Sequence, residues 1–316
     1  MESEAKSGVF RYQSSWSITQ TMEHLAHALR DGTDISITTS GSSGQPKEIL
    51  IPASAILFNA RNSNNFLGAK PGEKWSLLLS PEHTAGLNVL VRAMELGTEP
   101  LSQDERADYT SIVPTQLFRA LNGDEKLLKH LKDCKAVLVG GAASDEELLN
   151  RAKENGINCV TTYGMTETSG GCVYNGTPLP GVEIRIGETI QIKGAMLARV
   201  LLENGFFITK DLGFMKDGKL IVTGRADDVI ISGGKNISLS AVENLLGFEF
   251  AAMGRANKEW GTALIIVTTS EIEEKEIQSQ LSEKFGIKAL DVIRVSEIPR
   301  TALQKVDRAA LAKLLS

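Results

Sequence analysis

The chain has 316 residues, of which 42% are hydrophobic and 23% are charged. This length and composition exclude wholesale disorder and suit two domains with substantial cores. Thirty-four lysines and arginines against 39 aspartates and glutamates give a formal net charge of −5, which argues against a dedicated nucleic-acid binder.

The sequence also bears on the cellular compartment. It has no polybasic segment for an anionic membrane, no apolar run long enough for a membrane span, and no apolar signal core at its start. Its three cysteines form no Cys-x-x-Cys pair. We therefore expect a cytoplasmic protein without a membrane span, since a reducing compartment keeps thiols free.

The first half alternates helical and extended patterns. Residues 19–30 have apolar side chains at helical spacing, and residues 34–38 read as a strand. Further strands are expected at 74–79, 111–113 and 135–139. Ser144 and Glu147 form a capping-box pattern for a helix that ends at Gly156, and residues 157–161 return to a strand. Strand, helix and strand at this spacing predict a βαβ unit in a mostly parallel sheet.

The second half changes texture near Gly181 and again near Arg225. Short strands separated by glycines are expected at 182–186, 190–193, 198–202, 206–208 and 219–223, which predicts an antiparallel subdomain. The last segment has helices at 240–246, 271–285 and 307–315, with strands near Phe250 and at 263–268 and 292–295. We predict an α/β protein: a large mixed-sheet domain over 1–225 and a small α+β domain over 226–316.

A hydroxyl-rich loop follows the strand at 34–38. Its residues are Thr38, Thr39, Ser40, Gly41, Ser42, Ser43, Gly44, Gln45, Pro46 and Lys47. Glycines let backbone amides approach an anion, and hydroxyls and a lysine donate to phosphate oxygens. Lys47 is followed by Glu48, so this is not a Walker loop. The alternative is a flexible surface turn, but the preceding strand and the Pro-Lys ending favour phosphate binding.

Three further motifs carry polar groups suited to a nucleotide. After the strand at 157–161 come Tyr163, Gly164, Met165, Thr166 and Glu167, at the strand edge where open α/β sheets bind ligands. A stacking ring, a hydroxyl and a Mg²⁺-binding carboxylate would suit a base, a phosphate and a metal ion, and the alternative is a strand-end turn with incidental polar residues.

The third motif joins Lys210-Asp211-Leu212-Gly213 to the run from Gly224 to Asn236. Asp211 suits ribose hydroxyls with help from Arg225, and Ser232-Gly233-Gly234 exposes backbone amides. The alternative is a hairpin turn with solvated charge pairs. The fourth is Pro299-Arg300-Thr301 followed by Lys305, a lysine that by itself would be expected to face solvent. His83 lies between a strand and a helix, a usual place for a functional group.

These four motifs, in this order, resemble those of the adenylate-forming acyl-CoA synthetase superfamily. The match runs from Ile37 to the C-terminus. Within the superfamily the chain is most similar to the o-succinylbenzoate–CoA ligases of menaquinone biosynthesis, in their short form. The segments carrying this closer resemblance are 83–92, 139–143 and 162–174. It implies activation of a carboxylate by ATP and Mg²⁺ to an acyl-adenylate, followed by transfer of the acyl group to coenzyme A with release of AMP.

The resemblance implies a role for each motif position. The loop residues Thr39, Ser40, Gly41, Ser42, Ser43, Gly44 and Lys47 would hold the β- and γ-phosphates. Tyr163 would face adenine, with Gly141 and Ala142 at its edge; Thr166 would contact the α-phosphate and Glu167 the Mg²⁺; Asp211 and Arg225 would bind ribose. His83, Gly164 and Arg92 would line the acyl site, with Arg92 paired to a second substrate carboxylate.

The remaining implied roles concern the two half-reactions. Lys305 would stabilise charge at the α-phosphate during adenylation. Asp227 would be the hinge of a domain rotation that withdraws Lys305 and brings Ser232, Gly233 and Gly234 to coenzyme A. The departures from the family pattern are Ser43, Glu48, Lys210 and Gln304; none removes a hydroxyl or charge that the chemistry needs.

Three alternatives remain: adenylation that loads a carrier-protein thiol, a degenerate ligand-binding homologue, and another aryl or acyl substrate on the same machinery. The phosphate loop begins only 38 residues into the chain, so we expect most of the superfamily's N-terminal subdomain to be missing. Surfaces that it normally covers would then be covered otherwise, with a homodimer as one option.

Overall fold

The structure, a computed structural model, describes residues 8–40, 46–141, 146–232, 234–247, 249–257, 261–301 and 306–315. The helices, with 3₁₀ turns η1 and η2, are α1 (Ile18–Arg30), α2 (Ala53–Leu67), α3 (Thr84–Glu95), α4 (Pro114–Leu121), α5 (Glu125–Asp133), α6 (Glu146–Glu154), η1 (Thr166–Thr168), η2 (Ala226–Asp228), α7 (Leu239–Leu246), α8 (Glu274–Phe285) and α9 (Arg308–Leu314).

A mixed sheet forms the centre of the molecule. Its strands, in spatial order, are β4 (Trp75–Ser76), β5 (Tyr109–Ile112), β6 (Ala136–Val139), β7 (Cys159–Met165), β8 (Gly170–Tyr174) and β9 (Thr177–Pro178). β4 to β7 are parallel, and β8 and β9 are antiparallel additions. Every residue of β5 and β6 is buried, as expected for parallel strands covered on both faces.

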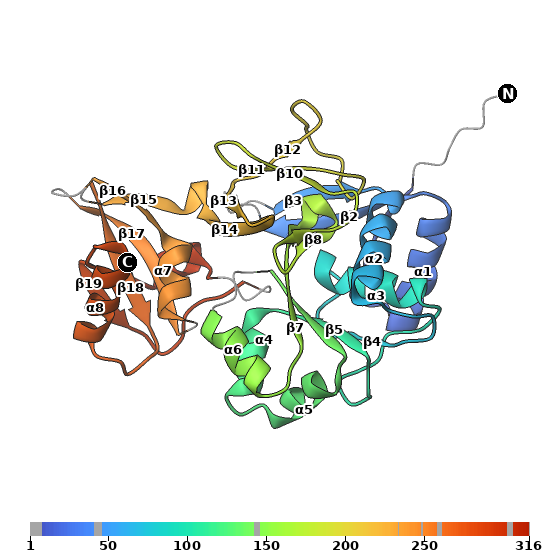
Figure 1. Cartoon of the computed structure of the whole chain (residues 1–316), viewed down its shortest axis with the longest axis horizontal. Helices are drawn as coiled ribbons and strands as arrows, with labels where there is room; N and C mark the ends of the chain where they lie inside the picture. The colour runs from blue at the N-terminus through green and yellow to red at the C-terminus, as the bar shows by residue number, and fades with distance from the viewer. Residues whose placement is uncertain are drawn as a thin grey trace.

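Smaller sheets surround this centre. One contains β1 (Val9–Arg11), β2 (Asp34–Ser40) and β3 (Pro46–Ile51). Two antiparallel sheets follow the central sheet in the sequence, and their strands are β10 (Glu183–Ile186), β11 (Ile190–Lys193), β12 (Phe207–Ile208), β13 (Asp211–Lys216) and β14 (Lys219–Arg225). In Figure 1 the β13–β14 sheet lies between the β10–β11–β12 sheet and the C-terminal part of the chain.

The C-terminal part is built around a separate sheet. Its strands are β15 (Val229–Ser232), β16 (Lys235–Ser238), β17 (Phe250–Asn257), β18 (Gly261–Thr268) and β19 (Asp291–Arg294). Figure 1 shows them with α7 and α8 at one end of the molecule. The hydrophobic clusters of this part contain only residues after 226, and those of the rest contain only residues before it.

Helix α3 carries Arg92 and begins directly after His83, two of the predicted site residues. His83 is its N-cap residue, and most of the helix from Thr84 to Ala93 is buried. Its start lies very close to the preceding loop, because a Cβ at Gly86 would stand 2.2 Å from the Ser80 carbonyl oxygen. Only glycine fits there. The polar side chains of α3 are therefore held in place by backbone packing.

The predicted fold class is confirmed: a mixed α/β part with antiparallel additions and a C-terminal α+β part. The strand predicted at 198–202 is wrong, since these residues form none. The strand predicted at 74–79 is only two residues long in the structure. Ser144 lies outside the described residues, so its capping role stays a prediction. Within the described parts of the chain, no helix has the length and apolar character to cross a membrane.

Candidate active site

The carboxyl edge of the parallel strands collects the first group of candidate residues. In the sheet register Ile112 of β5 pairs with Val139 of β6, and Val139 pairs with Thr161 of β7. Gly140 follows β6 directly and packs against β7, since a Cβ there would lie 2.2 Å from the Thr162 hydroxyl oxygen. Gly141 has φ +88°. This is the edge where open α/β sheets bind their ligands.

Tyr163, Asp211 and Arg225 form one hydrogen-bonded cluster at this edge. The Tyr163 hydroxyl donates to Asp211 Oδ2 (2.8 Å), and Arg225 Nη1 donates to Asp211 Oδ1 (3.1 Å). The Asp211 backbone N–H donates to the Thr209 hydroxyl. Burial and the neighbouring Asp211 carboxylate raise the pKa of Tyr163, so its hydroxyl stays protonated and donates. Asp211 is only 7% exposed and presents a carboxylate of fixed orientation.

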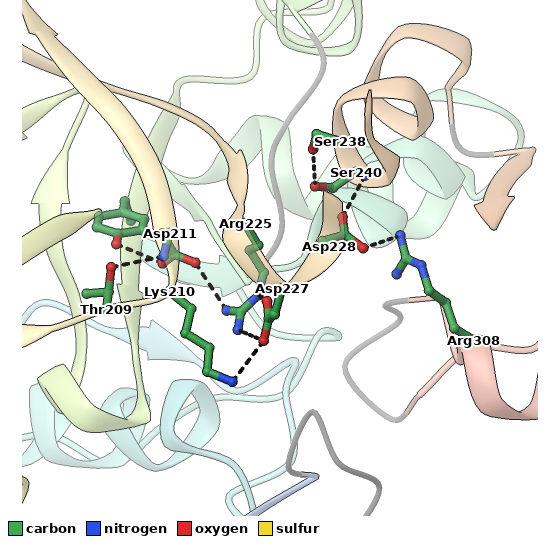
Figure 2. A network of polar contacts seen from close by, with 10 residues as sticks. Thr209, Lys210, Asp211, Arg225, Asp227, Asp228, Ser238, Ser240 and Arg308 are labelled. Atoms are coloured by element: carbon green, nitrogen blue, oxygen red, sulfur yellow. Dashed lines mark hydrogen bonds and ion pairs between the residues drawn. The ribbon is translucent and has the colours of Figure 1, made fainter. Parts of the chain in front are cut away.

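Two adjacent aspartates, Asp227 and Asp228, follow this cluster, and their carboxylates accept hydrogen bonds from different parts of the chain. Asp227 accepts from Arg225 Nε (2.8 Å) and Nη2 (3.1 Å), and from Lys210 Nζ (3.1 Å). Asp228 accepts from the Ser240 N–H (2.7 Å) and pairs with Arg308 (3.0 Å). Figure 2 shows Lys210 and Arg225 on one side and Ser240 and Arg308 on the other.

The charges around Asp227 support each other. Hydrogen bonds from Arg225 and then Lys210 lower the pKa of Asp227 to about 2. The hydrogen bond to Asp227 in turn raises the pKa of Arg225. Lys210, one of the departures from the family pattern, supplies a second cation to Asp227.

The turn that carries Thr166 and Glu167 is tied to the helices α2 and α3. The Thr84 hydroxyl donates to the Thr166 hydroxyl (3.0 Å), and Asn88 Nδ2 donates to the Ser169 carbonyl (2.7 Å). From α2, Asn59 Nδ2 donates to the Gly171 carbonyl (2.8 Å). The turn is closed by 3₁₀ geometry and a left-handed residue after it. Glu167 itself is half-buried.

Arg92 lies in the interior. It is 4% exposed, Nη1 donates to Ser111 Oγ (3.1 Å), Nη2 donates to Tyr174 Oη (3.3 Å), and the guanidinium lies over Trp75 at 5.1 Å. Among the described residues, Nε has no hydrogen-bond partner and no carboxylate forms an ion pair with this arginine. Burial lowers the pKa of its guanidinium. A cation buried among neutral groups is costly unless an anion joins it.

The predicted loops are partly described. Thr39 and Lys47 pair across the β2–β3 hairpin, where the Thr39 hydroxyl donates to the Lys47 carbonyl. Ser232 pairs with Lys235 at the β15–β16 hairpin, and Gly234 has φ +77° in its turn. The other predicted site residues lie outside the described residues: Gly41, Ser42, Ser43, Gly44, Ala142, Gly233 and Lys305.

Several residues of this arrangement carried no prediction from the sequence. Ser111 and Tyr174 contact Arg92, Thr84 contacts Thr166, and Thr209 contacts Asp211. A hydroxyl at the end of a buried parallel strand was a usable signal for Ser111. Tyr174 lay within a recognised segment, but no local pattern pointed to its partner.

Comparisons with known proteins identify the family and support the fold. The profile of the AMP-binding enzyme family matches residues 32–193. A Mycobacterium tuberculosis protein named probable 2-succinylbenzoate–CoA ligase is 36% identical, covering 92% of this chain and 88% of that protein. The Escherichia coli 2-succinylbenzoate–CoA ligase is 29% identical, covering 78% and 61%. The solved structure of Escherichia coli MenE with bound OSB-AMS has a TM-score of 0.77 at 24% identity, covering 96% of this chain and 71% of that chain. The chain belongs to the family of AMP-binding enzymes.

Proposed function

We propose that this protein is an ATP-dependent, AMP-forming ligase that joins 2-succinylbenzoate to coenzyme A. A substrate carboxylate attacks the α-phosphorus of ATP and pyrophosphate leaves. The coenzyme A thiol then attacks the acyl carbon, giving the thioester, and AMP leaves with the former carboxylate oxygen. Relatives named for this reaction support the assignment, as does the family of AMP-binding enzymes.

The observation that carries the substrate is the unpaired Arg92. In the described part of the chain this buried guanidinium has two neutral hydroxyl partners and no counter-charge. A second carboxylate on the substrate would supply it, through the planar fork that arginine offers to carboxylates. Benzoate and simple fatty acids have one carboxylate, which adenylation consumes. An acid with two carboxylates fits the charge of this site.

The length of α3 is compatible with such a substrate. Arg92 lies about 12 Å along the helix from Thr84 at 1.5 Å per residue, and helical side chains lean towards the N-terminus. A side chain that leans this way brings the guanidinium closer to the Thr166 turn than the Arg92 Cα is. The carboxyl carbons of 2-succinylbenzoate are about six bonds apart, or roughly 6–7 Å. One carboxylate would reach Arg92 and the other the α-phosphate.

The nucleotide would occupy the carboxyl edge of the sheet. Tyr163 offers its ring to adenine with Gly141 beside it, and the Asp211 carboxylate, oriented by Arg225, accepts from ribose hydroxyls. Asp211 already receives two hydrogen bonds, but an ionised carboxylate has room for about four. Thr166 donates to the α-phosphate, and the loop from Thr39 to Lys47 holds the outer phosphates.

The described residues fit a Mg²⁺ ion held mainly by phosphate. No group of three or more His, Cys, Asp or Glu that could hold a metal occurs among them. Magnesium in nucleotide enzymes is commonly held by one or two carboxylates with phosphate oxygens and water. Glu167 would be this carboxylate, and the ion would neutralise charge on the leaving pyrophosphate. Lys305 would do the same at the α-phosphate.

We also propose that residues 1–225 and 226–316 are two domains that rotate about Asp227. The separate hydrophobic clusters support this division. So do the two aspartates: Asp227 bonds to Lys210 and Arg225 before the boundary, and Asp228 bonds to Ser240 and Arg308 after it. Each aspartate would anchor one domain, and rotation would bring Ser232 and Gly234 towards coenzyme A. The homodimer and the cytoplasmic location stay predictions from the sequence.

The test is a panel of acids assayed with ATP, Mg²⁺ and coenzyme A. It contains 2-succinylbenzoate, its analogue 4-oxo-4-phenylbutanoate that lacks the ring carboxylate, benzoate and a fatty acid. Pyrophosphate release reports adenylation and mass spectrometry identifies the thioester. We expect 2-succinylbenzoate to give the highest kcat/KM, and Glu167→Gln to lose adenylation of every acid. A higher kcat/KM for a monocarboxylate contradicts the substrate, and adenylation without coenzyme A thioester favours loading of a carrier-protein thiol.

A further inference from the structure

We propose that Tyr174 is a specificity-determining positioning residue. Its hydroxyl, held by Ser63, orients the Arg92 guanidinium so that the enzyme selects acids with a second carboxylate. This inference rests on the proposed function. It concerns a residue on β8, 82 positions away from Arg92 in the sequence.

A chain of hydrogen bonds with one consistent direction supports this role. Arg92 Nη2 donates to Tyr174 Oη (3.3 Å), and Tyr174 Oη lies 2.7 Å from Ser63 Oγ. The Ser63 hydroxyl donates to the Asn59 carbonyl (2.9 Å). Because Ser63 has used its proton and arginine only donates, the tyrosine proton points to Ser63. The lone pairs of Tyr174 are thus left for Arg92.

Burial makes this chain rigid. Ser63 and Tyr174 are fully buried, and the Tyr174 ring packs edge-on against Phe66 with centroids 5.1 Å apart. Hydrogen bonds in such surroundings are stronger than in water, and a broken one is costly. The Tyr174 oxygen is therefore a fixed point against which the flexible arginine side chain is aligned.

The bonds that Arg92 makes leave donors for a ligand. A guanidinium has five N–H donors, and those to Ser111 and Tyr174 engage one on each Nη atom. Nε is buried without a partner. Both Nη atoms are hydrogen-bonded, and the guanidinium lies over the Trp75 ring. These three contacts fix the orientation of the guanidinium plane. Three of the five donors thus remain without a described partner: Nε–H and one N–H on each Nη atom.

The test compares Tyr174→Phe with wild type on 2-succinylbenzoate and on 4-oxo-4-phenylbutanoate. We expect kcat/KM for the diacid to fall about tenfold through KM, because one hydrogen bond to a charged group is lost. We expect kcat to stay within about twofold and the monoacid to be unaffected. Ser63→Ala, which removes only the support, gives the same pattern with a smaller loss. Continued turnover of the monoacid shows that the variants are folded.

Tyr109→Phe is the matched control. Tyr109 is also a buried tyrosine of the central sheet, but its hydroxyl donates to Glu73 (2.8 Å). It should leave the ratio between the two acids unchanged. An equal loss on both acids in Tyr174→Phe, or no loss on the diacid, overturns the positioning role. A wild-type enzyme with no preference for the diacid overturns the proposed function and this inference together, whereas a wild-type preference that is unchanged in Tyr174→Phe overturns this inference alone.

Discussion

Replacing Arg92 by methionine should separate binding of the substrate from stability of the fold. Methionine is unbranched and fills irregular core space, so the change removes the charge and keeps much of the volume. The loss includes two hydrogen bonds of about 1–3 kcal/mol each and a contact over Trp75 of about 0.5–2 kcal/mol. Against this stands the cost of an unpaired buried guanidinium, several kcal/mol. These contributions have opposite signs.

We therefore expect the free energy of unfolding of Arg92→Met to stay within about 2 kcal/mol of wild type. Binding of the diacid should weaken far more. Truncating one partner of a buried charged contact costs about 2–5 kcal/mol, which corresponds to about 30-fold to about 5,000-fold in kcat/KM. Turnover of 4-oxo-4-phenylbutanoate should change little, because it has no ring carboxylate to pair.

Urea unfolding and initial-rate kinetics with both acids measure these quantities. Arg61→Met is the matched control, since Arg61 of α2 is exposed and pairs with Glu95 of α3. This substitution should change neither the free energy of unfolding nor the kinetics appreciably. A destabilisation of Arg92→Met above about 3 kcal/mol, with equal loss of activity on both acids, would refute the reasoning. Arg92 would then be a structural residue of the core.

Three further changes test other parts of the molecule. Lys305→Ala should slow adenylate formation about 100- to 1,000-fold while thioester formation from supplied acyl-adenylate continues; equal loss in both steps argues against a rotating domain. Gly164→Ala should lower the free energy of unfolding by about 1–3 kcal/mol or more, because its Cβ would lie 2.1 Å from the Gly170 carbonyl oxygen; a wild-type urea midpoint contradicts this clash. Burial raises the pKa of Glu243 from 4.5 to about 7, so the folded state keeps a proton that the unfolded state releases. As pH rises from 4.5 to 7, the free energy of unfolding of wild type should therefore fall by up to about 3 kcal/mol relative to that of Glu243→Gln. If the free energies of unfolding of the two proteins change in parallel with pH, this linkage is excluded.

Most of the fold class could be predicted from local patterns. The helical spacing of residues 19–30 and the capping signals before α6 are properties of short segments, and the structure has helices at both places. The segment at 198–202 shows where this fails. It is apolar enough for a strand, yet the Ala198 N–H donates to the Glu167 carbonyl and the Arg199 N–H to the Leu50 carbonyl. These two hydrogen bonds do not form a strand ladder. Tertiary contacts decided its conformation.

By itself the sequence determined which chemical groups are available and in which order, because the motifs of nucleotide binding are short and contiguous. Arg92 became a candidate for a second carboxylate through the resemblance to a known family. Only the tertiary structure decided that this arginine is buried beside a tyrosine 82 positions away, with no counter-ion among the residues that the structure describes. It alone decided that Asp227 and Asp228, neighbours in the chain, bind different partners, Lys210 and Arg308. Both outcomes depend on partners brought together by packing, which no local spacing encodes.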